Sequence, residues 1–295
     1  MLDLRRLRLL HEFAHRGTVS AVAEALSYSP STVSHQLAAL ERDAGVALLV
    51  PSGRRLHLTP EGRRLAEVAE RMLALEEEAR GALRGTGPGA GPVRVAVFQT
   101  VTHSVVPRAL SLLRERAPDL RVEAAELAPE AGLAALVARR VDLVVAEQYQ
   151  NYARERVPGL DRVQLGSDEI RLAVPEDSPA ADLHDLREAV WVMEPEGTAA
   201  RTWTVQQCRA AGFEPDVRFE AADLLAHARL IAAGHAVGML PDLLTLQGAY
   251  PLRLRPLPGR PHRDIFTSAR LSSRDRVDVQ LVRAALRDGM PAGPA

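Results

Sequence analysis

The sequence lacks lysine and has a single cysteine, and each shortage excludes some chemistry. All 37 residues in the lysine-plus-arginine total are arginines. A guanidinium stays charged and can contact a phosphate through two parallel hydrogen bonds, although a GC-rich genome accounts for the same bias. The lone cysteine, Cys208, excludes a disulfide within the chain and a metal site built from thiolates.

Long apolar runs and the common catalytic motifs are also missing. No apolar run approaches the length of a membrane span, and Met1–Arg8 passes straight into an amphipathic pattern without a signal-peptide core. We therefore expect a cytoplasmic protein with no membrane contact. The nine histidines show no metal-ligand spacing, and neither a P-loop nor Gly-x-Gly-x-x-Gly occurs. Cys208 follows an apolar helical pattern, which is typical of a structural residue. We predict no enzyme activity, no catalytic residue, no metal and no cofactor.

Charge and length set two further limits. The formal net charge is −1, so no overall positive field attracts nucleic acid, and any DNA affinity must come from local arrangement. Residues 1–66 are only mildly basic, with nine arginines against six acidic residues. A length of 295 residues predicts at least two domains.

Residues 18–41 read as two short helices joined by a tight turn. Thr18 can cap the first helix. Ser29 can cap the second, with Pro30 at its first position, where a missing N–H has no effect. The second helix has an apolar face and, near its N-terminus, a polar face of Ser31, Thr32, Ser34 and His35. This pattern is typical of a recognition helix that enters a DNA major groove. An ordinary helical hairpin in a globular core is the alternative.

Two further elements belong to this N-terminal region. Leu56 and Leu58 alternate with Arg55 and His57, which predicts a two-stranded wing. Arg54 and Arg55 at its tip can contact a phosphate or the minor groove, or they can belong to a solvated turn. A helix then runs from Pro60 to about Leu83, roughly 36 Å long. Its apolar stripe has no partner nearby in sequence, so we expect it to pack against the same helix of a second subunit.

Residues 85–92 are glycine and proline with one threonine and one alanine, which predicts a hinge. Strand and helix patterns alternate beyond it, including a helix over 100–116, and indicate a mostly parallel sheet. Two similar α/β lobes are expected to enclose a cleft at their strand ends. Lobe one covers about 93–147 and 242–270, lobe two covers about 168–241, and 290–295 form a disordered tail.

Along nearly its whole length the chain resembles the LysR-type transcriptional regulators. Several spaced blocks carry this resemblance in the expected order. They are Gly17–Leu26, Ser29, Val33-Ser34, Gln36, Leu40-Glu41, Gly45, Leu48-Leu49, Gly53-Arg54-Arg55, Leu58–Gly62, Pro107, Leu110, Pro118, Val141–Leu143, Ala211–Phe213 and Ala232–Pro241.

The resemblance implies an α/β fold with three parts. These are a winged helix-turn-helix over 1–59, a dimerisation helix over 60–84, and, after the hinge at 85–92, an effector-binding domain over 93–289 like type 2 periplasmic binding proteins. It also implies a regulator that activates or represses promoters. Its implied partners are a dyad-symmetric double-stranded operator, a second copy in a homodimer or homotetramer, a small-molecule effector and RNA polymerase.

The chain departs from the family pattern at two places. Pro30 stands where the family often has a hydrogen-bonding residue, so base contacts are expected to shift to Ser31, Ser34 and His35. The basic residue that often follows the Leu-Phe pair is absent from Leu48–Pro51, so Arg54 and Arg55 should carry more of the phosphate binding.

Three segments are expected to line the effector cleft. Gln99, Thr100 and Thr102 lie where the first strand of lobe one turns into a helix, whose free N–H groups favour an anion. Gly197 and Thr198 occupy the equivalent loop of lobe two, and Gln148 lies at the crossover. A small carboxylate or amino acid fits this set. Two alternatives remain open: Thr100 and Thr198 can be helix caps, and Glu194 and Glu196 favour an effector that carries an amine.

Overall fold

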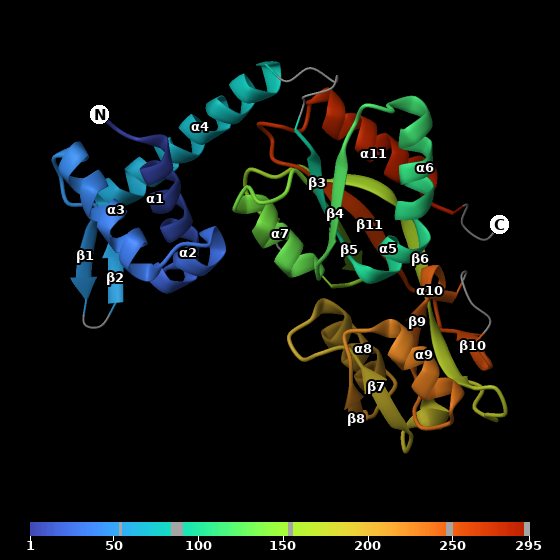
Figure 1. The fold of residues 1–295 in the computed structure, drawn as a ribbon. Coiled ribbons are helices and arrows are strands. Elements are labelled where there is room, and N and C mark those ends of the chain that lie inside the picture. Colours follow the sequence, from blue (N-terminus) through green and yellow to red (C-terminus); the bar gives the residue numbers. More distant parts are fainter. Residues whose placement is uncertain (53–54, 84–90, 153–155, 246–249, 292–295) are drawn as a thin grey trace.

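A computed structural model describes residues 1–52, 55–83, 91–152, 156–245 and 250–291. It has a winged helical domain, a long helix and a two-lobed α/β domain (Figure 1). The winged domain contains α1 (Leu4–Arg16), α2 (Val19–Leu26), α3 (Pro30–Ala44), β1 (Leu49–Ser52) and β2 (Arg55–Leu58). Thr18 and Ser29 cap α2 and α3 through their side-chain oxygens, as the sequence predicts.

The wing is held against α3 by a few specific contacts. The Glu41 carboxylate accepts hydrogen bonds from the Leu48 and Leu49 N–H groups at 2.9 and 3.0 Å. Thr59 caps α4 (Pro60–Leu83) by accepting from the Gly62 N–H, and it donates to the Ala47 carbonyl at 2.9 Å. A Cβ at Gly62 would lie 2.1 Å from the Leu48 carbonyl oxygen, so only glycine fits there. These contacts explain the spacing between Glu41, Leu48-Leu49 and Thr59–Gly62 in the sequence.

Helix α4 has a partner within its own chain, which the sequence analysis did not anticipate. Ala66 and Ala69 are buried in the winged-domain core, where α4 packs beside α1. Further along the same helix, Leu75 is 64% exposed. The first half of the apolar stripe therefore completes the winged domain, and the exposed Leu75 is available to another subunit. Dimerisation through α4 stays a prediction.

Lobe one is built on a sheet whose central strands are parallel. Strand β3 (Val93–Val97) lies between β4 (Val122–Glu126) and β5 (Leu143–Tyr149), and both pair with it in parallel. Beyond β5 the order continues with β11 (His262–Ser268) and β6 (Val163–Pro175), both antiparallel to their neighbours. The expectation of a mostly parallel sheet was therefore right for the centre only, because β11 returns from late in the chain between β5 and β6.

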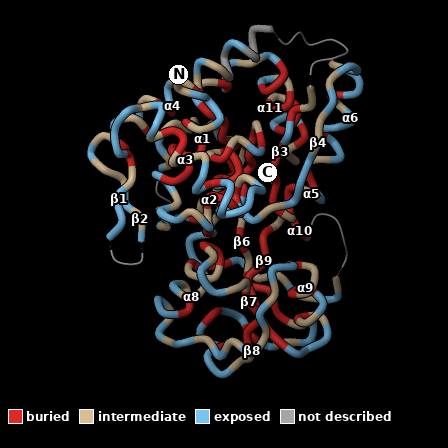
Figure 2. The backbone as a smooth tube through the Cα atoms, turned by 60° about the vertical axis from the view of Figure 1, so that its left-hand side comes forward, coloured by how far each residue is buried: buried red, intermediate tan, exposed pale blue. Residues whose placement is uncertain are grey.

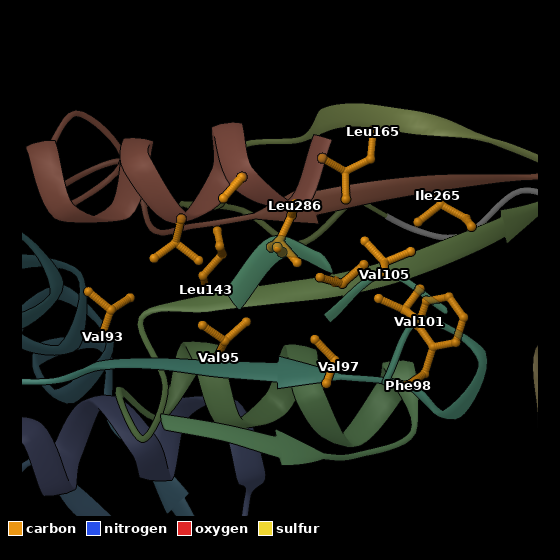
Figure 3. Packing of buried hydrophobic residues seen from close by; sticks show 14 of the residues in the cluster. Val93, Val95, Val97, Phe98, Val101, Val105, Leu143, Leu165, Ile265 and Leu286 are labelled. Carbon is orange, nitrogen blue, oxygen red and sulfur yellow. The ribbon is translucent and has the colours of Figure 1, made fainter. Parts of the chain in front are cut away.

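Helices cover both faces of this sheet. Alternate residues of β3 point to opposite sides. Val93, Val95 and Val97 face Leu286 of α11 (Val277–Gly289), as Figure 3 shows. On this side α11 packs beside α6 (Val106–Arg116). Ala96 faces the other side, where α7 (Pro129–Val137) packs.

The expected helix over 100–116 is interrupted at Val105. It consists of α5 (Gln99–Ser104) and α6, with Pro107 in the first turn of α6. Because proline lacks an N–H, it favours a fresh helix start over continuation.

Lobe two shares β6 with lobe one. The Ile170–Pro175 half of β6 pairs with β9 (Gly238–Pro241) and β10 (Leu252–Pro256), both antiparallel. A parallel pair, β7 (Val190–Met193) and β8 (Asp216–Glu220), joins β9 through a bridge between Trp191 and Val237. Helices η1 (His184–Leu186), α8 (Ala199–Ala210), α9 (Leu224–Ala232) and α10 (Asp242–Thr245) complete the lobe.

Figure 2 shows buried residues running along the strands of both lobes, whereas the wing is largely exposed. Residues 84–90, most of the predicted hinge, lie outside the described residues, as do 292–295 of the predicted tail. Met290 is partly buried against the core of lobe one, so ordered packing continues one residue beyond α11.

Candidate functional site

The polar face of α3 is exposed. Ser31, Thr32, Ser34 and His35 all lie on the surface. The apolar residues that alternate with them, Val33, Leu37 and Leu40, are at most 2% exposed. The helix therefore presents its N-terminal polar side chains to solvent, the arrangement that major-groove reading requires.

The hydroxyl groups at the start of α3 form a small network. Ser29 Oγ lies 2.8 Å from Ser31 Oγ and 2.7 Å from Thr32 Oγ1, and it accepts from the Thr32 N–H at 3.1 Å. Ser34 and His35 make no side-chain hydrogen bond within the described residues. The network orients the first two hydroxyls and leaves Ser34 and His35 free for a partner.

A hollow of about 310 Å³ beside α3 contains residues that sequence reasoning missed. Arg5 is exposed at the start of α1, Tyr28 is 50% exposed, and Arg6 Nε donates to Gln36 Oε1 at 3.0 Å. These side chains meet because α1 crosses α3. The sequence carries the basic residues of α1 but gives no direct sign of this crossing. Arg5 adds a cation next to the polar face.

Of the two wing arginines, Arg55 lies on β2 with an exposed side chain. The prediction for Arg54 falls outside the described residues. Pro30 is exposed at the first position of α3 and offers no donor.

In the two-lobed domain, Thr100 is buried and belongs to an ionic network. Arg263 on β11 donates to Thr100 Oγ1 at 2.7 Å, to the Glu147 carboxylate at 2.5 Å and to the Asp168 carboxylate at 2.7 and 3.0 Å. Asp168 also accepts from the Leu243 N–H at 2.9 Å. Thr100 is therefore not the cap of α5, which the sequence analysis left open, but an acceptor for a buried guanidinium.

Gln99 bridges the two lobes. Its side-chain amide donates to Asp223 Oδ1 at 2.5 Å and accepts from the Leu224 N–H at 2.9 Å, both at the start of α9. Burial raises the pKa of Asp223, but the hydrogen bonds from Gln99, Leu225 and Ala226 outweigh it, so the net shift is downward. Thr102 instead donates to the Phe98 carbonyl within its own turn. Gln99 thus joins the two lobes.

The lobe-two loop is only partly as predicted. Gly197 has a φ of +85°, a conformation that favours glycine. Thr198 caps α8 by accepting from the Arg201 N–H at 3.2 Å, and it donates to the Pro195 carbonyl at 2.8 Å. Thr198 is therefore a helix cap, the alternative that the sequence left open for this residue.

The Gln148 side chain does not lie on the same side of β5 as the network around Thr100 and Arg263. Neighbouring side chains on a strand point to opposite faces. Glu147 and Tyr149 point to the Arg263 side of β5, whereas Gln148 accepts from Arg162 on the other side.

Burial changes the acid–base properties of the cleft. Burial, and secondarily the nearby Glu147, raises the pKa of Glu194 to about 8. Burial also raises the pKa of Asp168, although Arg263 opposes this effect.

Among the described residues no group of three or more histidine, cysteine or acidic side chains could hold a metal ion. In the same residues no helix is long and apolar enough to span a membrane.

Comparison with known proteins matches each half of the chain to a known domain profile. Residues 4–63 match the profile of the bacterial regulatory helix-turn-helix proteins of the lysR family, and residues 86–291 match the LysR substrate binding domain. The transcriptional dual regulator GltC of Bacillus subtilis is 29% identical, over 82% of this chain and 81% of its own. A probable hydrogen peroxide-inducible genes activator of Streptomyces viridosporus is 30% identical, over 98% of this chain and 94% of its own.

Solved structures with a similar fold cover nearly the whole chain. Full-length OxyR from Pseudomonas aeruginosa is similar with a TM-score of 0.66 at 19% identity, over 97% of this chain and 95% of that one. OxyR from Corynebacterium glutamicum gives 0.58 at 23% identity, over 98% and 92%.

The chain belongs to the LysR family of transcriptional regulators. It is a ligand-responsive, DNA-binding regulator and not an enzyme.

Proposed function

We propose that this regulator binds a dyad-symmetric operator as a homodimer or homotetramer and changes promoter activity when a small molecule occupies the cleft between its lobes. The observation that carries the DNA half is the exposed polar face of α3, whose Ser34 and His35 make no side-chain hydrogen bond in the described part of the chain. Exposed donors and acceptors on an otherwise packed helix are suited to base edges.

The contacts divide into two kinds. Ser31, Thr32, Ser34 and His35 read base edges, and Pro30 contributes no hydrogen bond. Arg54 and Arg55 of the wing contact phosphates, and Arg5 beside α3 is placed to add a third cation. Base contacts set the preferred sequence, whereas phosphate contacts strengthen binding to all sequences.

The effector occupies the cleft near Gln99, Thr100, Thr102, Gly197 and Thr198. Gly197 is the more favourable position, since the side chains of Gln99, Thr100, Thr102 and Thr198 already have hydrogen-bond partners within the chain. Gln148 faces the other side of β5, which weakens its assignment. Because Gln99 already joins the lobes, an effector there changes how the lobes are held.

Peroxide sensing by a thiol is a second candidate, suggested by the names of several relatives. The side chain of Cys208 argues against it here. Cys208 is fully buried in lobe two, and burial raises the pKa of its thiol to about 12. Because the thiolate is the reactive form, this residue is unsuited to peroxide.

We further propose that the protein acts in the cytoplasm, because its proposed partners, the operator and RNA polymerase, are found there. Mobility shift with the DNA upstream of its own gene tests the proposal. We expect specific binding that weakens steeply with salt and requires both halves of the dyad. Equal affinity for the upstream fragment and a scrambled fragment would contradict the proposal.

A further inference from the structure

A small cavity in lobe two joins a carboxylate to two aromatic rings. Its lining includes Tyr149 of β5, Trp203 of α8, His227 of α9 and Glu194, which follows β7. Its volume is about 20 Å³, room for about one water molecule. A ligand larger than a water molecule can therefore enter only if the side chains around this cavity move apart.

The Glu194 carboxylate has no partner in this cavity. Within the described residues no group hydrogen-bonds it; only its backbone carbonyl accepts a bond, from Arg201 at 3.3 Å. A partly buried carboxylate without a partner is unfavourable, because desolvation is not offset. The carboxylate can therefore accept a donor or a cation from outside the chain.

The nearby basic groups do not supply that partner. Arg263 is 2% exposed, and its guanidinium is shared between Glu147, Asp168 and Thr100. His227 Nε2 donates to the Ala221 carbonyl at 2.7 Å, and burial lowers the pKa of its ring. His227 is therefore neutral near pH 7. The positive charge of Arg263 is already shared by Glu147 and Asp168, so it does not neutralise an ionised Glu194.

The two aromatic rings give the cavity a second feature that favours a cation. The Tyr149 and Trp203 ring centroids lie 5.3 Å apart at 32°. Trp203 Nε1 already donates to the Gln150 carbonyl at 3.0 Å, so only its ring surface, which is 1% exposed in this structure, is left for a ligand once the cavity opens. Aromatic faces attract ammonium and guanidinium groups.

We propose that the effector carries an organic cation, an ammonium or guanidinium group, which pairs with Glu194 and packs on Tyr149 and Trp203. This inference rests on the proposed function and names the effector class. Glu147 of lobe one lies close enough to Glu194 for the two charges to interact. A cation between them attracts carboxylates from both lobes and so favours closure around the ligand.

The charged groups around Glu194 predict how binding depends on pH. Burial is the main cause that raises the pKa of Glu194. Glu147 on β5 and Glu130 on α7 raise this pKa further, and Arg263 on β11 lowers it, with a net value of about 8. Below pH 8 the carboxyl is protonated, so a cation must displace a proton. We expect affinity for the cation to rise with pH up to about 8, by at most about tenfold per pH unit, and then to level off.

Thermal unfolding of the full chain with n-butylamine, and with pentanoate as the anionic counterpart, tests the proposal. Butylammonium should raise Tm by about 2–4 °C or more at pH 8 and less at pH 6, and pentanoate should not. Glu194→Gln should weaken the butylammonium effect about tenfold or more in apparent affinity and remove its pH dependence. Glu188→Gln is the matched control in the same lobe, since the Glu188 side chain is 92% exposed, and should respond like the wild type.

Stabilisation by pentanoate alone, or an equal butylammonium response in Glu194→Gln, would overturn the proposal. If Glu194→Gln does not fold, the pH dependence of the wild-type response decides: a response that is flat between pH 6 and 8 overturns the assignment. Operator binding without ligand is measured on the same preparation. Its loss would contradict the proposed function, whereas intact operator binding without any ammonium response would contradict only the effector class.

Discussion

Helix α3 and the region between the lobes use polar residues in opposite ways. Ser34 and His35 on α3 are exposed and make no side-chain hydrogen bond in the described structure. In the cleft Thr100 and Arg263 are buried and joined by a hydrogen bond. These two side chains of α3 are thus available to an external partner. The cleft is stabilised by bonds within the chain, so a ligand must rearrange existing contacts.

The largest expected effect is in the buried network. Arg263→Met leaves Glu147 and Asp168 buried without their cation, and we expect the free energy of unfolding to fall by about 3–5 kcal/mol. The control is Arg64→Met, whose side chain is 73% exposed and paired only with Glu61. That change should cost less than about 1 kcal/mol. Urea unfolding of both full-length variants measures the difference, and equal losses would show that the cleft network is no more stabilising than a surface pair.

On the DNA side, Arg55→Ala should weaken binding to specific and scrambled DNA alike and reduce the salt slope by about one. Ser34→Ala should instead change preference between operator variants, with about 1–3 kcal/mol of discrimination lost at one base pair. The control is Arg42→Ala, an exposed arginine in the last turn of α3, far from the polar end. Fluorescence anisotropy over a salt series separates the cases, and identical profiles for the Arg55 and Ser34 variants would refute the division of roles.

A smaller effect is expected at the contact between the lobes. Gln99→Ala removes the bonds to Asp223 and Leu224, each worth about 1 kcal/mol. We expect faster hydrogen exchange in the first turn of α9, because the Leu224 amide loses its acceptor. Thr102→Val is the matched control, since Thr102 bonds only within its own turn. Unchanged exchange in Gln99→Ala would mean that other contacts hold the lobes together.

The smallest expected effect is at Cys208. With a thiol pKa of about 12, the thiolate fraction at pH 8 is on the order of 1 in 10⁴. Iodoacetamide should therefore leave the native protein unmodified by mass spectrometry and label it after unfolding in urea. Rapid labelling of the native chain would reopen the thiol-sensing alternative.

The two regions also differ in how far the sequence predicts them. The faces of α3 follow from local periodicity and from the cap at Ser29, so its exposed residues could be read directly. Glu147, Asp168 and Arg263 could not, because β11 brings together positions far apart in the chain. No local pattern reports that register.

Other differences between the predicted and the observed structure had a local signal in the sequence. Pro107 marks the break between α5 and α6. Strand alternation places Gln148 opposite Glu147, so one of these two neighbours had to face away from the cleft. Packing of α4 on α1, by contrast, depends on tertiary geometry that an apolar stripe alone leaves open.

Strand β6 has one more consequence. Its first half pairs with β11 in lobe one, and its second half pairs with β9 and β10 in lobe two. A single uninterrupted strand therefore belongs to both lobes, and neither lobe can turn without bending a shared hydrogen-bond ladder. The domain behaves as an elastic joint in which the stiffness of β6 limits the angle through which the lobes can turn. We expect the resistance of β6 to bending to limit how far an effector can turn one lobe against the other.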